Sequence, residues 1–121
     1  MKKIVLIEDS KVLATALLGA FKVENIEAHW AENGVKGVTM AKQVRPDVIL
    51  LDLMLPKISG FDVCKLLKTD NATWRIPIVI MSTLSDEESR QRATEAGADY
   101  FIPKPYDLKD TLAQIKKILK L

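Results

Sequence analysis

Acidic, hydroxyl and lysine side chains follow closely after four short apolar segments of this 121-residue chain. They are Glu8 and Asp9 after Ile4–Ile7, Asp52 after Val48–Leu51, Ser82 and Thr83 after Ile78–Met81, and Lys104 after Tyr100–Ile102. If these groups meet, their carboxylates stay ionised only beside a cation, and oxygen ligands suit a hard divalent ion such as Mg2+. A lysine and a hydroxyl nearby would bind an anion. Such a set indicates phosphoryl transfer, in which charge neutralisation dominates catalysis and a carboxylate can be the nucleophile.

The apolar segments that precede these side chains have the composition of buried strands. They are rich in β-branched residues and do not alternate with polar ones, as expected for parallel strands covered on both faces. A weaker segment of the same kind lies at Ile26–Trp30. Segments with the apolar spacing of helices separate them. The repeated strand–helix order predicts an α/β fold, a doubly wound (βα)5 unit with a five-stranded parallel sheet.

The order of the strands decides whether the polar groups meet. The flavodoxin-like order 2-1-3-4-5 is the common arrangement of five such units, although length and element count alone do not select it. In that order the first, third, fourth and fifth strands are neighbours. Ligands of such sheets bind beyond the carboxyl ends of the strands. We therefore expect the groups after these four strands to converge on one pocket.

Apolar side chains at helical spacing predict the faces that the helices bury. They include Val12, Leu13, Ala16, Leu17, Ala20 and Phe21 in the first helix and Val35, Val38 and Ala41 in the second. Ser59 and Asp107 are suited to begin the third and fifth helices as N-caps, and Ser85–Glu88 forms a capping box for the fourth. The segment Ser85–Ala96 is otherwise so polar that we expect a weakly held helix there.

Composition places the chain among ordinary globular proteins, and its length fits one domain over residues 1–121. Its 18 basic and 16 acidic residues give a net charge of +2, too balanced and too scattered for a nucleic-acid-binding chain. The single Cys64 permits no intrachain disulfide, and no apolar segment is long enough to span a membrane. We expect a cytoplasmic protein in which Trp30 and Trp74 are partly exposed packing residues.

Several segments together resemble the receiver domains of two-component response regulators. They are Ile7–Ser10, Pro46–Pro56, Ser59–Gly60, Pro77–Ser82, Gly97–Asp99 and Pro103–Pro105. Each motif is weak alone, but together they cover essentially the whole chain in family-like order and spacing. The resemblance implies a phosphorylation-controlled switch rather than an enzyme with a separate substrate. It implies Asp52 as the phospho-acceptor and a phosphohistidine as the donor.

The resemblance also implies the ligands of a magnesium ion. Asp9 and Asp52 would bind Mg2+ directly, Met54 would offer its backbone carbonyl, and Glu8 would act mainly through water. Lys104 would pair with the phosphoryl group, and the peptide bond from Lys104 to Pro105 is expected to be cis. The catalytic residues would be Asp52, Lys104 and Ser82.

The resemblance further implies a switch and a set of residues that control access. The hydroxyl of Ser82 would hydrogen-bond the phosphoryl group, and the Phe101 ring would rotate in response. Thr83 stands where the family commonly has alanine, so its bulk is expected to affect phosphoryl transfer. Met54 and Leu84 are apolar at the positions that influence water access. We therefore expect slow hydrolysis and a long-lived phosphorylated state.

The partners implied are a sensor histidine kinase or phosphotransfer protein as donor, and a downstream effector protein or a fused output domain as target. The signalling surface would comprise the predicted fourth helix, fifth strand and fifth helix. We expect no direct contact of this domain with nucleic acid or a membrane, and dimerisation on phosphorylation stays open.

Other functions fit the sequence less well. The acidic residues could be plain helix caps, with Asp9 or Ser10 beginning the first helix. A phosphatase or phosphomutase would place a second aspartate two residues after its nucleophile, where this chain has Met54. A flavin-binding protein would need a phosphate loop rich in serine and threonine after the first strand, where Glu8 and Asp9 would repel the phosphate. A receiver-like domain that has lost phosphorylation would not keep the full set of acids.

Overall fold

Strands and helices alternate along the whole chain. The computed structural model describes residues 1–84, 86–104 and 107–121. The elements in chain order are β1 (Lys3–Ile7), α1 (Lys11–Val23), β2 (Glu27–Ala31), α2 (Gly34–Val44), β3 (Val48–Leu51), α3 (Gly60–Thr69), β4 (Ile78–Ser82), α4 (Glu87–Glu95), β5 (Tyr100–Pro103) and α5 (Leu108–Ile118). The five predicted strands are confirmed to within one residue at each end. None of the helices described is long and apolar enough to cross a membrane.

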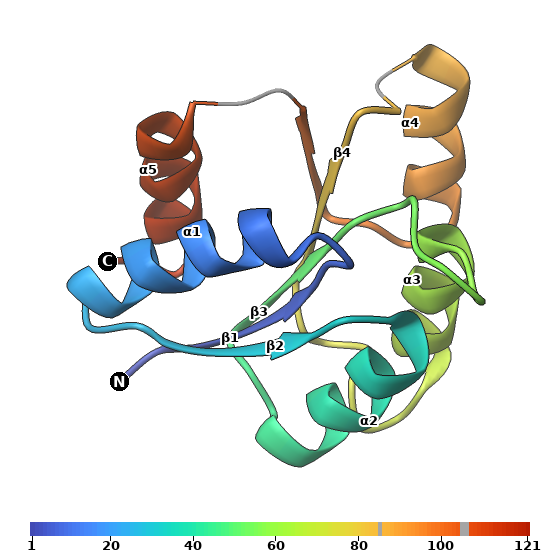
Figure 1. Cartoon of the computed structure of the whole chain (residues 1–121). Helices are drawn as coiled ribbons and strands as arrows, with labels where there is room; N and C mark the ends of the chain where they lie inside the picture. Colours follow the sequence, from blue (N-terminus) through green and yellow to red (C-terminus); the bar gives the residue numbers. More distant parts are fainter. Residues whose placement is uncertain (85, 105–106) are drawn as a thin grey trace.

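The strands form one parallel sheet in the order β2-β1-β3-β4-β5, which confirms the flavodoxin-like prediction. β1 lies beside β3 with Ile7 opposite Leu51, and β4 lies beside β5 with Ser82 opposite Pro103. The carboxyl ends of these four strands therefore meet at one edge of the sheet. Figure 1 shows that edge between the first turns of α1 and α4.

Alternate side chains of each strand face opposite sides of the sheet, so the core lies in two layers. Figure 1 shows α1 and α5 on one side and α2 and α3 on the other. The first layer includes Ile4, Leu6, Leu17, Phe21, Val48, Leu50 and Ile115. The second includes Val5, Ile7, Ala41, Ile49, Leu51, Val63 and Leu67. Since all side chains of Ile4–Ile7 and Val48–Leu51 are fully buried, close packing holds the strands that carry the site.

Two predicted helix faces are wrong in part. Val12 is 84% exposed and Val35 is 61% exposed, although the apolar spacing predicts both to face the core. In α1, Ala16 is exposed as well, and Ala14 is buried instead. In α2 the buried positions are instead Gly34, Gly37 and Ala41. A Cβ atom on Gly37 would lie 2.5 Å from the Ile7 side chain, so α2 approaches β1 too closely for a larger residue. Apolar spacing misses such a face because glycine contributes no apolar side chain.

The predicted caps are confirmed where the structure describes them. Ser59 begins α3 and accepts from Asp62, and Asp107 begins α5 in the same way. α4 begins one residue later than the predicted capping box, with Asp86 as its N-cap, and Ser85 itself lies outside the described residues. As expected from its sequence, α4 contributes a single fully buried side chain, Ala93.

The segment before β5 has a structural role. Gly97 has a φ of +103°, a left-handed conformation that favours glycine. Two residues on, the Asp99 carboxylate accepts from the Ile78 amide at 2.9 Å and pairs with Lys68 at 2.7 Å. The Lys68 ammonium also donates to the Ile76 carbonyl at 2.8 Å. These contacts connect α3 to the starts of β4 and β5, at the sheet edge opposite the polar groups.

Gly60 closes the loop that follows β3 onto α3. Its N–H donates to the Leu53 carbonyl at 2.8 Å. A Cβ atom at Gly60 would overlap the Asp52 carbonyl oxygen and the Cα atom of Leu53, which are backbone atoms of that loop. The backbone after Asp52 therefore depends on a residue without a side chain at the start of α3.

We predict opposite effects of alanine at two glycines. Gly60→Ala is expected to lower the free energy of unfolding by more than about 2 kcal/mol, because backbone must move to admit the methyl group. Gly19→Ala, in the exposed interior of α1 with nothing within 4 Å, is expected to raise it by about 0.5–1 kcal/mol. Urea unfolding followed by circular dichroism measures both. A Gly60→Ala protein as stable as the unmodified one would contradict the close approach.

Candidate functional site

Three carboxylates from two strand ends form one cluster. One oxygen each of Glu8, Asp9 and Asp52 lies within 4.8 Å of the others. Glu8 is 1% exposed and Asp52 is 6% exposed, whereas Asp9 lies open to solvent. The predicted convergence of these acids is confirmed. Their donors are all oxygens, so the cluster could hold a hard divalent cation that enters from the side of Asp9.

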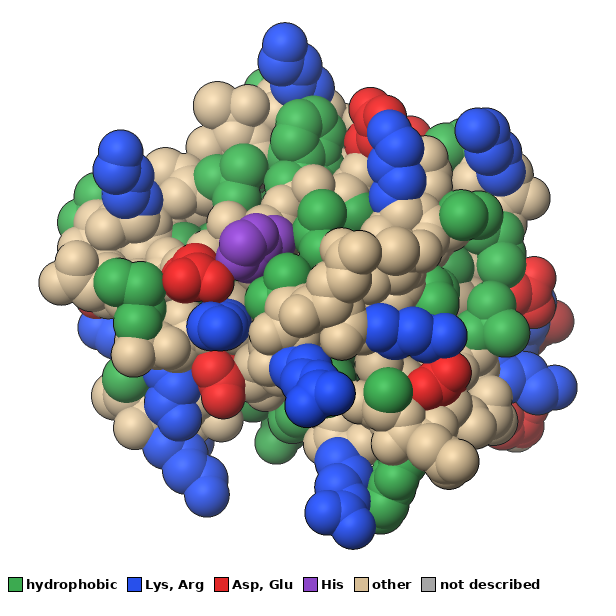
Figure 2. Space-filling model, turned by 90° about the horizontal axis from the view of Figure 1, so that it is seen from below, with side chains coloured by type: hydrophobic (Ala, Val, Ile, Leu, Met, Phe, Trp, Pro, Cys, Tyr) green, Lys and Arg blue, Asp and Glu red, His purple; other side chains and the backbone are tan. Residues whose placement is uncertain are grey.

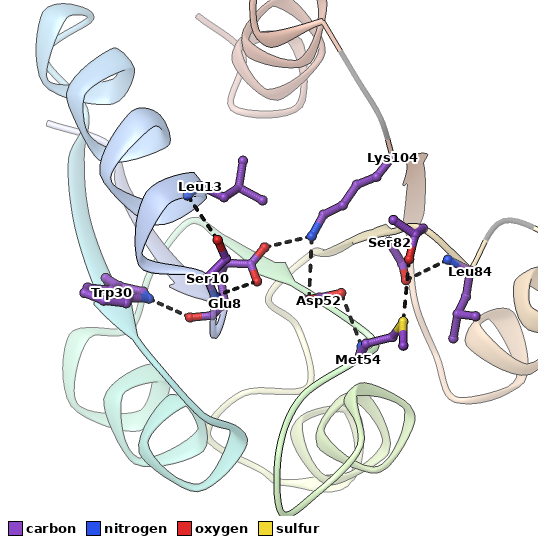
Figure 3. A network of polar contacts seen from close by, with 10 residues as sticks. Glu8, Ser10, Leu13, Trp30, Asp52, Met54, Ser82, Leu84 and Lys104 are labelled. Carbon is purple, nitrogen blue, oxygen red and sulfur yellow. Dashed lines mark hydrogen bonds and ion pairs between the residues drawn. The ribbon is translucent and has the colours of Figure 1, made fainter.

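Glu8 is held through both its backbone and its side chain (Figure 3). Its N–H donates to the Ala31 carbonyl at 3.0 Å, and its own carbonyl accepts from the indole N–H of Trp30 at 2.7 Å. The carboxylate accepts from the Ser10 amide at 3.2 Å and from the Lys104 ammonium at 2.8 Å. These four hydrogen bonds leave Glu8 little freedom to move away from the other acids.

Asp52 continues the ladder between β1 and β3. Its N–H donates to the Ile7 carbonyl at 3.0 Å, which places its side chain just beyond the end of the buried strand. Oδ1 accepts from the Met54 amide at 3.2 Å, and Oδ2 lies 3.6 Å from the Lys104 ammonium. One oxygen is thus oriented by the backbone, and the other faces the nearest cation.

Lys104 follows the edge strand β5, and its side chain brings a positive charge into the cluster. Its N–H donates to the Ser82 carbonyl at 2.7 Å, which extends the pairing of β4 with β5. Its ammonium lies between Glu8 and Asp52 but is closer to Glu8, and only 14% of the side chain is exposed. The lysine therefore neutralises part of the charge of the acids.

Asp9 is not the N-cap of α1, which was the alternative role that the sequence left open for it. The side chain of Ser10, not that of Asp9, accepts from the Leu13 amide and caps α1. Partial burial, followed by the hydrogen bond and the charge of Glu8, raises the pKa of Asp9 above its ordinary value, while Lys104 acts in the opposite direction. Partial burial and the neighbouring Glu8 thus disfavour the ionised form of Asp9, and a bound cation would favour it.

The hydroxyl and access residues lie on the β4 side of the site. Ser82 is fully buried, and its hydroxyl accepts from the Leu84 amide at 3.1 Å. Thr83 is exposed, and its hydroxyl contacts the Met54 sulfur at 3.5 Å. Met54 is itself 55% exposed. The side chains of Thr83 and Met54 therefore meet at the rim beside Asp52, where a donor or water would enter.

Phe101 is the second residue of β5, on the amino-terminal side of Lys104, and is half-buried. It packs at the edge of the second core layer, and the Arg90 guanidinium of α4 lies 4.7 Å from its ring centroid. The aromatic residue is thus in contact with α4 rather than with the acids. The predicted cis bond between Lys104 and Pro105 lies outside the described residues. The role of the Met54 carbonyl as a metal ligand stays a prediction.

Trp30 was expected to be a packing residue, and its polar contact was missed. The half-buried ring does pack against the first core layer, but its N–H bonds to the Glu8 carbonyl. The signal was present in the strand order, since β2 lies beside β1 and an indole near the end of β2 can reach the residue that follows β1. A periodicity argument that classes tryptophan as apolar does not detect its donor.

We predict that neutralising Asp9 stabilises the protein when no metal is added. A raised pKa means that the folded state binds more protons than the unfolded chain, so stability falls as the pH rises through that pKa. Asp9→Asn is expected to raise the free energy of unfolding at neutral pH by less than about 1 kcal/mol, because solvent screens this open residue. The difference should vanish at acidic pH. Urea unfolding at several pH values measures it.

The matched control is Asp62→Asn, which neutralises an exposed carboxylate in the first turn of α3, outside the cluster. It is expected to give no gain in stability, since an acid near a helix N-terminus is favourable. Equal gains from both substitutions would show that general charge, rather than the cluster, is responsible.

Comparison with known proteins gives a consistent result. A family model described as the response regulator receiver domain matches residues 4–116. The chain is 32% identical over 120 residues to the DNA-binding dual master transcriptional regulator RpaA of Synechocystis, covering 99% of this chain and 50% of that protein. The chain spans about half the length of the curated relatives it matches.

Solved structures agree with the fold. A two-component response regulator from Clostridium difficile superposes with a TM-score of 0.92 at 28% identity, covering 99% of this chain and 97% of that one. The receiver domain of the sensor histidine kinase PA1611 from Pseudomonas aeruginosa gives a TM-score of 0.89 at 21% identity and covers 99% and 98%. That protein holds a magnesium ion in its active site cleft.

Proposed function

The chain belongs to the response regulator receiver domain family of two-component systems, and on that premise we propose that Asp52 is its phospho-acceptor. The donor would be a phosphohistidine of a sensor histidine kinase or phosphotransfer protein. The observation that carries the proposal is the meeting of three carboxylates with the Lys104 ammonium at the end of the buried strands. The single Lys104 ammonium neutralises only part of the charge of three carboxylates, and such clusters of charged groups are typical of functional sites.

The oxygen donors of the cluster fit a magnesium ion. Asp9 and Asp52 would bind it directly, the Met54 carbonyl would complete the protein ligands, and Glu8 would act through water. When bound, the metal would neutralise charge on the transferring phosphoryl group. The Pseudomonas receiver domain, which shares the fold, holds magnesium in its cleft. These ligand assignments are part of the proposal.

The transfer itself would be a direct exchange of one bond for another. An Asp52 carboxylate oxygen forms a bond to phosphorus, and the bond from phosphorus to the donor histidine nitrogen breaks, with its electron pair returning to the imidazole. The Lys104 ammonium, already 3.6 Å from Oδ2 of Asp52, would balance the charge of the phosphoryl oxygens. The Met54 amide donates to Oδ1 at 3.2 Å and would restrict the rotation of the carboxylate during the transfer.

The new phosphoryl group would be detected through Ser82. The hydroxyl of Ser82 accepts from Leu84, so its hydrogen is what it can offer to a phosphoryl oxygen. As the resemblance implies, the ring of Phe101 would then change position, and that ring contacts Arg90 on α4. The contact between β5 and α4 supports the proposal that α4, β5 and α5 form the signalling surface.

The output of the switch would lie outside this domain. Residues 1–121 would form one receiver unit, and the curated relatives it matches are about twice its length. RpaA is described as DNA-binding. We propose that this receiver controls a fused output domain or a separate effector protein, and that it makes no nucleic-acid contact of its own.

We predict that phosphorylation requires Asp52. Incubation with Mg2+ and acetyl phosphate is expected to add the mass of one phosphoryl group to the unmodified protein and none to Asp52→Asn. The matched control is Asp47→Asn, at the opposite end of the same strand, where the carboxylate accepts from the Lys3 amide. That protein should be phosphorylated normally. Labelling that persists in Asp52→Asn, measured by intact-mass spectrometry, would place the acceptor elsewhere.

We also predict a long-lived phosphorylated state, because Met54 and Leu84 give water no polar partner beside Asp52. Met54→Gln is expected to shorten the half-life of the aspartyl phosphate several-fold, since an amide can hydrogen-bond an attacking water. Leu66→Gln serves as the control, because Leu66 is an exposed apolar residue on α3 outside the site. Release of inorganic phosphate measures the rate, and loss within seconds from the unmodified protein would contradict the prediction.

A further inference from the structure

The indole of Trp30 makes a short hydrogen bond to the backbone beside the acidic cluster. Its N–H donates to the Glu8 carbonyl at 2.7 Å. Trp30 lies on β2, where its backbone is opposite Leu6 of β1. Figure 3 shows the ring reaching the Glu8 carbonyl from the side of Glu8 away from Lys104. The indole and the Lys104 ammonium therefore bind Glu8 from opposite sides, one at the carbonyl and the other at the carboxylate.

The carbonyl that Trp30 binds belongs to the peptide group joining Glu8 to Asp9. That group is planar, so fixing its oxygen also fixes the amide nitrogen of Asp9 and the direction in which the chain enters Asp9. The ladder between β1 and β2 reaches its last backbone bond at the Glu8 N–H, which donates to Ala31. The indole thus supplies the next bond, one position beyond the end of the ladder.

Asp9 is held between two fixed points. On one side is the peptide oxygen bound by Trp30, and on the other is Ser10, whose side chain caps α1. Asp9 itself is open to solvent, and its own position depends on these neighbours. Magnesium requires near-ideal octahedral geometry, so a small rotation of this peptide would misplace a ligand.

We propose that Trp30 is a positioning residue for the metal site, acting through the peptide group between Glu8 and Asp9. The inference rests on the proposed function, since it requires Mg2+ at the cluster. Groups that orient metal ligands affect affinity although they do not touch the metal. Because the bond is already present without metal and acts on a peptide group rather than on a ligand side chain, we expect an effect at or below the low end of what such groups contribute, about a threefold to tenfold change in the dissociation constant.

The test removes the N–H donor. In one variant Trp30 is replaced by 3-benzothienylalanine, which keeps the bicyclic ring and has sulfur in place of the indole N–H. In a second variant it is replaced by phenylalanine, which also removes part of the ring. The same replacements at Trp74, 49% exposed and outside the site, are the controls. Calorimetric titration of the whole chain with Mg2+ is expected to give about a threefold to tenfold weaker dissociation constant at Trp30 and no change at Trp74.

A second readout separates positioning from a general effect on folding. In a Trp74→Phe protein, Trp30 is the only tryptophan, since the chain has two. Mg2+ is expected to change its emission, and Asp9→Asn should abolish that response. Urea unfolding without metal reports the structural contribution of the indole. A benzothienyl protein that loses stability yet binds Mg2+ as tightly as the unmodified chain would overturn the inference.

The outcome also distinguishes this inference from the proposed function. If the unmodified protein binds Mg2+ and the Asp9→Asn protein does not, the proposed metal site is supported. The Trp30 variants then decide the role of the indole. If the unmodified protein binds no Mg2+, both the metal part of the proposed function and the inference fail.

Discussion

Mutual repulsion among three carboxylates is the constraint around which the polar edge of this sheet is arranged. Glu8 and Asp52 are buried, so water screens their charges poorly. Partial burial of Asp9, followed by the hydrogen bond and the charge of Glu8, raises the pKa of Asp9. The fold does not separate these groups. It holds them with backbone hydrogen bonds to neighbouring strands, from Glu8 to β2 and from Asp52 to β1. Charges kept together at a cost in stability are typical of functional sites.

Within the part of the chain that the structure describes, the Lys104 ammonium is the main positive charge that offsets this repulsion. It reaches the acids from β5, and its backbone bond to Ser82 joins the cation to the strand that carries the hydroxyl. The ammonium is nearer to Glu8 than to Asp52. A divalent cation entering the cluster would compete with the lysine for Glu8, and the ammonium could then serve a phosphoryl group on Asp52. Metal binding and phosphoryl recognition would thus share one set of contacts.

The elements around the site differ in how tightly they are packed. β1 and β3 are completely buried along the residues that lead to the acids, and Gly60 lets α3 close on the loop after Asp52. α4 packs on the same face of the sheet as α3, but it buries only Ala93 fully and contacts its neighbours through cations on rings, Arg90 on Phe101 and Arg92 on Phe61. An element with so few apolar contacts opens at a lower free-energy cost than the buried strands. Figure 2, which views the molecule from below, shows lysine and arginine side chains spread over that face rather than gathered into one patch, in keeping with the scattered charge of the sequence.

The sequence by itself determined where the strands lie along the chain. It also determined which polar residues follow them, namely the acids, Ser82 and Lys104. Uninterrupted β-branched segments have few alternatives to buried parallel strands, and polar groups directly after them must lie at the strand ends. Only the tertiary structure decided which carboxylate oxygens face the Lys104 ammonium and that this ammonium lies closer to Glu8 than to Asp52. The close packing of α2 on β1 at Gly37 is also visible only there. The tertiary structure also decided that the indole of Trp30 binds the peptide between the two acids of β1. Those features depend on distances between segments far apart in the chain, and residue type and spacing do not encode such distances.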